Sequence, residues 1–407
     1  MKIYLVGGAV RDQLLNYPLK DKDYVVVGST VDDMLKQGFT PVGKGFPIFI
    51  HPQTKAEYAL ARTERKSGIG YKGFEIFTSP DVSIEQDLQR RDLTINAMAQ
   101  NEEGLVDPYG GMADLEAKVL RHVSSHFVED PLRVLRVARF AARYAHLGFT
   151  VADETMQLLQ EMTVTGELTT LSPERVWQEI SRSLEDSSPE VFFETLRQCG
   201  ALAVILPELD ALFGVPQPHK HHPEIDTGVH TMMVLQQAAR LSKSPVVRFA
   251  ALVHDLGKAL TMKQYWPSHH GHEKKGLIAL KSLTKRLRVP NEYAQLAEKV
   301  TQFHTHCHRA FELKAGTLLD LLESLGAFRH RQKLESFLLA CEADSKGRLG
   351  LEGRAYPQAD YIRQVYEAVN TVDAKEFAKQ GLEGKQIGEA VYAKRKVIIE
   401  GLKKANS

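Results

Sequence analysis

The sequence predicts an α+β fold in which a small mixed α/β head is followed by a chain that is helical to its end. Short apolar runs alternate with turn residues over positions 1–111, as expected of strands in a compact sheet. Over positions 112–215, apolar residues recur at spacings of three and four, which is typical of helices. Histidines concentrate after about residue 216, which distinguishes this part of the chain as a further domain. The expected domains are 1–111, 112–215, 216–350 and 351–407.

The composition is that of an ordinary globular protein. The 407 residues are 43% apolar and 25% charged, with a net charge of +1, and a chain of this length builds two to four domains. A near-neutral total still permits an RNA partner, because basic residues can gather on one face. Three widely spaced cysteines form no disulfide framework and fit a reducing compartment. We therefore expect a cytoplasmic protein without a signal peptide or membrane segment.

Strands are expected at Ile3–Val6, Asp23–Val27, Pro47–His51 and Glu57–Arg62, with a helix near Asp32–Gln37. Asp21 and Asp23 stand two apart at the start of the second strand, so their side chains project from one face. Two neighbouring acids repel each other unless a cation lies between them. Carboxylates together with substrate phosphates are typical Mg²⁺ ligands. The pair therefore indicates a magnesium site.

Gly7-Gly8 precedes a short helix that carries Arg11 one turn in, and this arrangement can receive a phosphate. Together with the acid pair, it indicates a site for a metal-bound nucleoside triphosphate. Glu57, on a neighbouring strand, is either a third metal ligand or base toward an attacking hydroxyl, or a solvated acid at a strand start. The glycine-rich, charged segment 63–73 is expected to be a mobile loop.

The order of these features, GGAVRDxLL followed by DxD at the start of an apolar strand, resembles the nucleotidyltransferase superfamily that includes polymerase β. More narrowly, it resembles bacterial tRNA CCA-adding enzymes and their poly(A) polymerase relatives. The resemblance implies a polymerase-β-like head, and a neck and body over 112–215 that hold the acceptor end of tRNA. It also implies CTP and ATP as substrates.

Residues 85–99 are expected to form a helix, and Arg90-Arg91-Asp92 with Asn96 match the family's RRDxxxNA motif. In the family, the second arginine contacts the triphosphate and the asparagine lies near the sugar, which gives these roles to Arg91 and Asn96. A guanidinium suits this role because its planar fork binds phosphate oxygens in pairs. Without the other motifs, a charged helix face would be the better explanation of the segment.

A helix is also expected after Asp130-Pro131, with Asp130 as its N-cap. Arg133, Arg136, Arg139 and Arg143 then fall within about 120° of one another, and such a stripe needs an anionic or hydrogen-bonding partner. The segment resembles the family's EDxxR motif, which implies that Asp130 and Arg133 read the Watson–Crick edge of the incoming base. Arg136 and Arg139 would then hold phosphate or contacts within the body.

Further helices are expected at 151–162, 173–185 and 189–199. In FAALVHDLGK, His254-Asp255 end an apolar helix that Gly257 is expected to stop. Histidine and aspartate are good ligands for divalent transition metals, so this clustering indicates a metal site.

The segment resembles an HD domain, a helical metal-dependent phosphohydrolase fold. The resemblance implies a divalent transition metal, with Ni²⁺ as one candidate, and a bound metal that activates water against a phosphate ester. Asp320 competes with Asp344 as the late acidic ligand, and the histidines at 219–222 are given no role. The implied core ligands are His230, His254, Asp255 and Asp344, with His272 and His304 as additional metal or phosphate contacts.

Taken together, these features predict template-independent addition of C, C and A to tRNA 3′ ends, with accessory phosphatase or 2′,3′-cyclic phosphodiesterase activity in the HD domain. One alternative is a poly(A) polymerase, although the HDxGK segment and short N-terminus count against it. Another is an HD phosphohydrolase with a degenerate RNA-binding head. The chain is expected to be a monomer or homo-oligomer. Its basic C-terminal segment either touches RNA or forms a solvated helix face.

Overall fold

The computed structural model describes residues 1–19, 22–42, 48–66, 74–220 and 222–405. The chain divides into two compact units. The first unit comprises Met1–Glu179 with Val191–Ile205, and the second comprises Ile180–Glu190 with Leu206–Ser407. Strands occur in the first unit and the second is helical, so the predicted α+β class is confirmed. Among the described residues, no helix combines the length and apolar character needed to cross a bilayer.

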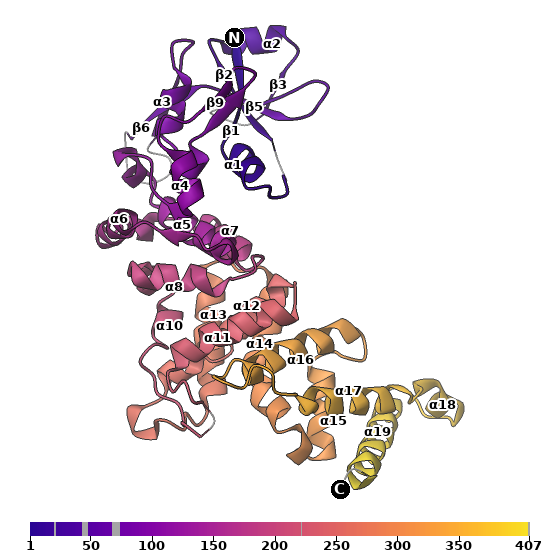
Figure 1. Cartoon of the computed structure of the whole chain (residues 1–407). Coiled ribbons are helices and arrows are strands. Elements are labelled where there is room, and N and C mark those ends of the chain that lie inside the picture. The colour runs from indigo at the N-terminus through magenta and orange to yellow at the C-terminus, as the bar shows by residue number, and fades with distance from the viewer. Residues whose placement is uncertain (20–21, 43–47, 67–73, 221, 406–407) are drawn as a thin grey trace. The chain divides into compact units, whose positions relative to one another are not determined.

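A seven-stranded mixed sheet forms the head of the first unit (Figure 1). Strands β2 and β5 are parallel and place Asp23 beside Glu57, whereas the other neighbouring pairs are antiparallel. In spatial order the strands are β3 (Thr40–Val42), β4 (Ile48–Ile50), β5 (Glu57–Leu60), β2 (Asp23–Val27), β1 (Lys2–Val6), β8 (Ala99–Asn101) and β9 (Gly104–Val106).

The sheet is buried on both faces, which explains the continuous apolar run of β2. Val25 belongs to one core cluster and Val26 to another, because successive side chains of a strand project to opposite faces. Helix α2 (Val31–Lys36) contributes Met34 to the Val26 cluster, and α3 (Ile84–Gln89) contributes Leu88 to the Val25 cluster. The middle of β2 is therefore fixed, and Asp23 lies at its exposed start.

Two predictions of local structure are wrong. The segment expected to be a loop begins with a strand, β6 (Arg62–Lys66), which pairs with β7 (Phe74–Thr78), while residues 67–73 lie outside the described part of the chain. The helix expected over 85–99 ends at Gln89, and the following backbone becomes extended at Leu93. The Asp92 carboxylate accepts a hydrogen bond from Leu93 N at 2.9 Å, which competes with helical bonding.

The remainder of 1–205 is mainly helical and includes the helices expected near 151–162, 173–185 and 189–199, which are confirmed. The region is not wholly helical, because β10 (Val119–Leu120) and β11 (Thr150–Val151) form a small parallel pair. The helices are α1 (Gly8–Leu14), α4 (Gly111–Ala117), α5 (Leu132–Tyr144), α6 (Asp153–Val164), α7 (Pro173–Ser183), α8 (Glu190–Gln198) and α9 (Ala201–Ile205).

The second unit is built around α11, α12, α14 and α16, which pack against one another. Gly257 does not stop α12, which ends at Val253. Instead, a Cβ at Gly257 would lie 1.9 Å from the carbonyl oxygen of His272, so glycine permits the close approach of α13. The helices are α10 (Pro207–Asp210), α11 (Thr227–Leu241), α12 (Pro245–Val253), α13 (His272–Arg286), α14 (Asn291–His308), α15 (Ala315–Ser324), α16 (Arg331–Lys346), α17 (Pro357–Asn370), α18 (Ala374–Lys379) and α19 (Lys385–Ala405).

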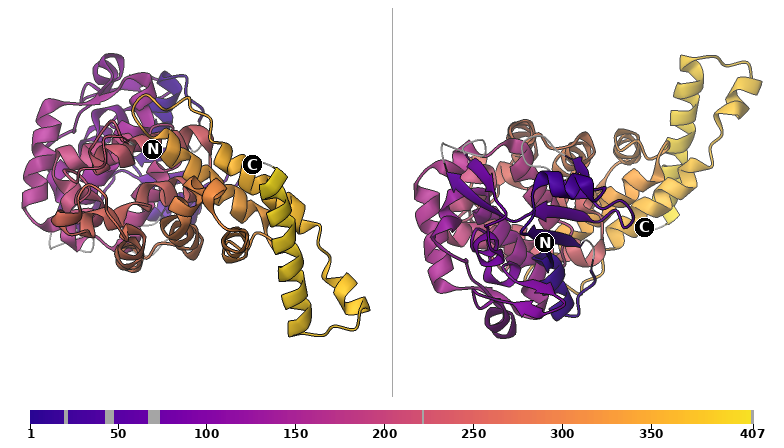
Figure 2. Two further views of the ribbon diagram at one scale, coloured as in Figure 1. Left: turned by 90° about the horizontal axis from the view of Figure 1, so that it is seen from below. Right: turned by 90° about the horizontal axis from the view of Figure 1, so that it is seen from above.

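Helices α18 and α19 extend as an arm from the rest of the second unit (Figure 2). Two basic residues of α19 contact the unit itself. The Arg395 guanidinium lies 3.7 Å from the Phe328 ring centroid, and Lys403 Nζ donates a hydrogen bond to Phe311 O at 3.1 Å. Part of the basic C-terminal segment therefore anchors the arm.

Candidate nucleotide site and candidate metal centre

The first unit contains an open cavity of about 570 Å³ between the head strands and α5. Nine arginines and three aspartates line it, together with Gly7, Gly8 and Asn96, so its charge is strongly positive. Such an excess of guanidinium groups suits a polyphosphate. The arginines are Arg11, Arg62, Arg90, Arg91, Arg133, Arg136, Arg139, Arg143 and Arg175.

The Gly7-Gly8 turn brings the backbone close to a cavity arginine. Gly7 has a φ of 65°, and a Cβ there would lie 2.6 Å from Arg91 Nη1. Glycine is therefore needed at this position both for its backbone conformation and for space. Arg91 is held by Asp87, whose Oδ2 accepts a hydrogen bond from Arg91 Nη2 at 3.2 Å.

A buried chain of hydrogen bonds joins three of the predicted nucleotide-binding residues. Arg11 donates to Asn96 Oδ1, and Asn96 Nδ2 donates to Asp92 Oδ1 at 2.9 Å. Arg136 Nε donates to Asp92 Oδ2 at 2.7 Å. Burial opposes ionisation of Asp92, but the charge of Arg136 and these hydrogen bonds hold the pKa of Asp92 well below its usual range. Asp92 thus fixes the positions of Arg136 and Asn96.

All four arginines of the predicted α5 stripe reach the cavity, although each is also held by the protein. Arg139 pairs with Glu179 in a contact where only 9% and 3% of the two side chains are exposed. Arg143 Nη2 lies 3.3 Å from Asp12 Oδ2. Arg133 donates to the carbonyl oxygen of His126 at 2.8 Å. The stripe is therefore fixed in place by groups behind the cavity wall.

Asp130, the predicted base reader, is already engaged on both carboxylate oxygens. Its Oδ1 accepts a hydrogen bond from Leu132 N at 3.0 Å, at the start of α5, and its Oδ2 pairs with Arg175 Nη2 at 3.0 Å. Arg175 lines the same cavity but was not among the predicted residues. It lies 45 positions along the chain from Asp130, and no local pattern indicated the contact.

Of the acids predicted to hold magnesium, Asp23 lies in the cavity wall. Asp21 lies outside the described residues. Glu57 is exposed and faces Asp23 in the register of β2 and β5, but it is not among the residues that line the cavity.

In the second unit, four predicted ligands from three segments converge. His230 Nε2 on α11 lies 3.1 Å from Asp344 Oδ1 on α16, and His254 Nε2 lies 3.1 Å from Asp255 Oδ2. All four side chains are buried. The structure places Asp344, and not Asp320, in this cluster. Asp320 instead accepts a hydrogen bond from the hydroxyl of Tyr392 at 2.8 Å.

This cluster has the inventory of a divalent-metal site. His254 Nε2 and Asp255 Oδ1 are buried and make no hydrogen bond of acceptable geometry to any described residue, so a metal ion could use both atoms as ligands. Ligand atoms of His254, His304 and Asp344 lie within 4.8 Å of one another. Burial opposes the charge on His254, but the carboxylates of Asp255 and Asp344 raise its pKa to about 8. Burial lowers the pKa of His304 well below its usual value, which leaves a neutral, metal-binding imidazole.

The predicted additional contacts also lie here. His272 Nε2 is 3.4 Å and His304 Nε2 is 3.6 Å from Asp255 Oδ1. Lys258, from the same HDLGK segment, places its Nζ 2.6 Å from Asp255 Oδ2. Although burial opposes its ionisation, the charges of His254 and Lys258 hold the pKa of Asp255 well below its usual range.

The sequence analysis missed three residues of this cluster. His222, which was given no role, is buried against His230, with ring centroids 4.7 Å apart. Its Nδ1 lies 3.0 Å from Glu224 Oε1, and burial lowers the pKa of His222 to about 4. His308 Nε2 lies 2.6 Å from Asp344 Oδ2. The spacing of His304 and His308, four apart on one helix, was the signal that could have found the latter.

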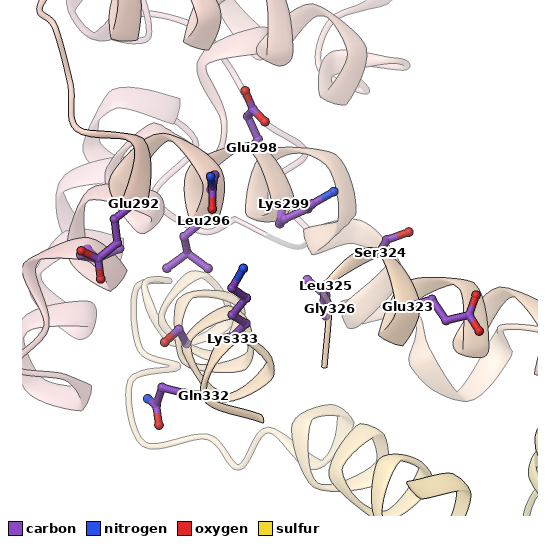
Figure 3. Close-up of a pocket in the computed structure, with 13 residues that line it drawn as sticks. Glu292, Leu296, Glu298, Lys299, Glu323, Ser324, Leu325, Gly326, Gln332 and Lys333 are labelled. Carbon is purple, nitrogen blue, oxygen red and sulfur yellow. The ribbon is translucent and has the colours of Figure 1, made fainter. Parts of the chain in front are cut away.

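A separate cavity of about 350 Å³ is lined by residues of α14, α15 and α16. Figure 3 shows Leu296 and Lys333 directed toward one another, whereas Glu298 points away from them. Acids and lysines are mixed in its lining, which contains no histidine. This cavity therefore has neither the arginines of the first site nor the ligands of the second.

Comparison with known families matches three parts of the chain. Residues 3–121 match the poly A polymerase head domain, and residues 148–213 match the family described as the probable RNA and SrmB-binding site of polymerase A. Residues 227–344 match the HD domain. The solved structure of a CCA-adding enzyme, apo form II, covers 99% of the chain with a TM-score of 0.66 at 20% identity, and the Thermotoga maritima CCA-adding enzyme complexed with tRNA has a TM-score of 0.63 at 20% identity.

The fold and its two sites thus define a nucleotidyltransferase that carries an HD domain. The multifunctional CCA protein of Teredinibacter turnerae is 56% identical over 100% of this chain and 99% of its own length, and that of Vibrio campbellii is 58% identical over 98% and 99%. The chain belongs to the family of multifunctional CCA proteins.

Proposed function

We propose that the chain adds C, C and A to the 3′ end of tRNA without a template, using CTP and ATP. The observation that carries this proposal is the arginine-lined cavity of the first unit, which joins the Gly7-Gly8 turn, Asp23 and the α5 stripe in one wall. Arg11, Arg91 and Asn96 would contact the triphosphate and sugar. The helical region after the head would hold the acceptor end of the tRNA.

Magnesium would be held by Asp21 and Asp23, with Glu57 as the neighbouring acid. A bound magnesium ion supplies charge stabilisation for phosphoryl transfer. The cavity arginines bind and orient the triphosphate. Because Asp92 and Glu179 fix Arg136 and Arg139 before a nucleotide arrives, little ordering is required on binding.

Base selection would use Asp130 and Arg133. The exocyclic amino group of cytosine or adenine is a hydrogen-bond donor, and a carboxylate beside a guanidinium offers the matching acceptor and donors. Asp130 is paired with Arg175 through Oδ2, and an ionised carboxylate has about four acceptor sites, so an incoming base would share Asp130 with Arg175. The energy of base reading would then include any weakening of the Asp130–Arg175 pair.

The histidine cluster would hydrolyse phosphate monoesters and 2′,3′-cyclic phosphates at RNA ends. A divalent transition metal such as Ni²⁺ fits its nitrogen-rich ligand set, and a bound metal supplies an activated water. Free and buried Cys199, Cys307 and Cys341 support a cytoplasmic, reducing environment for both activities. The cluster residues proposed to act here are His230, His254, Asp255, Asp344, His272 and His304.

The test is to offer a tRNA transcript lacking its last three nucleotides with CTP, ATP or both, and to sequence the product ends. Asp23→Asn should abolish incorporation and leave 2′,3′-cyclic phosphate hydrolysis intact, and His254→Ala should do the reverse. Asp81→Asn, an exposed acid of the head outside the cavity, is the matched control. A homopolymeric A tail from ATP alone would instead identify a poly(A) polymerase. Hydrolysis without any incorporation would identify a degenerate head.

A further inference from the structure

A second cavity of about 390 Å³ lies beside the histidine cluster in the second unit. It shares His308 and Arg348 with the cavity of about 230 Å³ that contains the predicted metal ligands. His308 bridges the two physically, because its Nε2 contacts Asp344 at 2.6 Å and its Nδ1 contacts the Tyr356 hydroxyl at 2.8 Å. A ligand bound across both cavities would therefore pass along His308 and Arg348.

The wall of this cavity contains an unmatched donor and an unmatched acceptor. Arg348 Nε and Gln358 Oε1 are both buried and have no hydrogen-bond partner among the described residues. A buried polar atom without a hydrogen-bond partner is destabilising, so two of them around one cavity require an explanation. A ligand that offers both an acceptor and a donor would satisfy them together.

The cavity is also cationic. Arg348 and Arg354 line it, whereas none of its lining residues is an acid. The nearest recorded acid contact of Arg348 is long, with 3.9 Å between Nη2 and Asp344 Oδ1. Arg354 is exposed, and its side chain makes no salt bridge to any described residue. Two guanidinium groups in such a wall are suited to phosphate oxygens.

The wall is held rigidly behind these groups. The Tyr356 hydroxyl is fixed by His308 and donates to Cys307 Sγ at 3.3 Å, and Gln358 Nε2 donates to the carbonyl oxygen of His308 at 3.4 Å. The amide orientation of Gln358 leaves its oxygen as the free acceptor.

We infer that this cavity binds the phosphodiester and ribose of the nucleotide that precedes the terminal one, so that the histidine cluster acts on RNA ends in preference to mononucleotides. Arg348 and Arg354 would contact the phosphodiester oxygens. Gln358 Oε1 would accept a hydrogen bond from the ribose 2′-hydroxyl, the group that distinguishes RNA from DNA. The inference rests on the hydrolytic function proposed above for the same cluster.

The test compares two substrates, adenosine 2′,3′-cyclic phosphate and the dinucleotide adenylyl-adenosine 2′,3′-cyclic phosphate. The unaltered protein should give a higher kcat/KM with the dinucleotide. Arg354→Gln should lower kcat/KM for the dinucleotide about tenfold, as expected for a lost charged hydrogen bond, and leave the mononucleotide within twofold. Arg329→Gln, which removes an equally exposed charge outside the cavity, should match the unaltered protein on both substrates.

A binding measurement separates this inference from the hydrolytic function. Equilibrium dialysis measures the binding of the dinucleotide that carries a 3′-phosphate to chelator-treated protein, and it requires no turnover. Arg354→Gln should raise the dissociation constant about tenfold relative to Arg329→Gln. If binding depends on Arg354 but no hydrolysis is seen, the proposed subsite is supported and the proposed hydrolytic function is refuted. Hydrolysis with no effect of Arg354→Gln on substrate preference or binding would overturn the subsite. Competition by inorganic phosphate with no preference for the dinucleotide would assign the cavity to released phosphate, and would also overturn it.

Discussion

Replacement of Glu179 by glutamine should lower the free energy of unfolding of the first unit by about 3 kcal/mol. The Arg139 and Glu179 side chains are only 9% and 3% exposed, so the pair belongs to the buried class and not to the surface class. Exposed pairs contribute about 0–1 kcal/mol, whereas removal of one partner of a buried pair costs about 3–5 kcal/mol. We expect the lower end, because glutamine still accepts one hydrogen bond from Arg139.

The chain provides its own reporter for this measurement. It contains two tryptophans, one in each unit, and Trp266→Phe leaves Trp177 as the sole fluorophore. Trp177 is buried on α7, two residues before Glu179. Urea unfolding followed by its fluorescence therefore reports on the first unit. Glu161→Gln, which removes an exposed acid from α6 of the same unit, should change the free energy of unfolding by less than about 0.5 kcal/mol.

A double variant shows whether the loss of stability comes from an unpaired buried charge or from lost packing. Arg139→Met combined with Glu179→Leu removes both charges together, and such replacements are often neutral in stability. The double variant should therefore be more stable than the Glu179→Gln protein, and measured against Arg139→Met and Glu179→Leu alone it should show a coupling of at least about 2 kcal/mol. A loss below about 1 kcal/mol for Glu179→Gln, or additive losses in the double variant, would refute the claim that this pair fixes the α5 stripe.

Three further predictions concern other parts of the chain. Asp92→Asn should lower the free energy of unfolding by about 3 kcal/mol at pH 7. Because folding lowers the pKa of Asp92, its stabilising effect is present above the unfolded pKa of about 4 and is lost progressively as the pH falls from there through the folded pKa. The urea unfolding curves of the two proteins should therefore converge in acid. Gly257→Ala should destabilise the second unit by about 3 kcal/mol, since a Cβ would meet the His272 carbonyl oxygen. The urea assay is the same, with Trp177 replaced so that Trp266 is the sole fluorophore. Gly353→Ala, where a Cβ would have nothing within 4 Å, should have little effect. Ni²⁺ at about 100 times its dissociation constant should stabilise the second unit by about 2.7 kcal/mol, and neither chelated protein nor His254→Ala should show this gain.

Much of the fold could be predicted, because the relevant patterns are local. The apolar run of β2 indicated a strand with the acids at its start, and the spacing of the α5 arginines placed them on one side of a helix. The failure over 85–99 is instructive. Leu93 and Ile95 are fully buried, as a helix would also bury them, but the Asp92 carboxylate competes for the backbone and the chain turns out of the helix. The spacing of apolar residues does not reveal a hydrogen bond between a side chain and the neighbouring backbone.

The sites were predicted less completely, for a different reason. The spacing of residues along a helix predicts which of them share a face, but it does not predict which residues of other elements that face contacts. Glu179 lies 40 positions beyond Arg139, and Arg175 lies 45 positions beyond Asp130. Likewise, Asp320 competed with Asp344 as the late acidic ligand, and only the packing of α16 against α11, which brings Asp344 to His230, decides between them. Long-range partners of this kind follow from the fold alone.

These long-range partners change how the arginine cavity is understood. Nine guanidinium groups around one space would repel each other, yet Asp92 in the cavity wall and Glu179 and Asp12 behind it neutralise several of them. Folding therefore positions the arginines, and a triphosphate binds to a preformed site. Asp130 differs from these acids because its side chain is 24% exposed, whereas those of Asp92, Glu179 and Asp12 are at most 8% exposed, so the Asp130–Arg175 pair is accessible to an incoming base. Rigid cations for the phosphates and one accessible acid–arginine pair for the base are the combination required of a polymerase that selects nucleotides without a template.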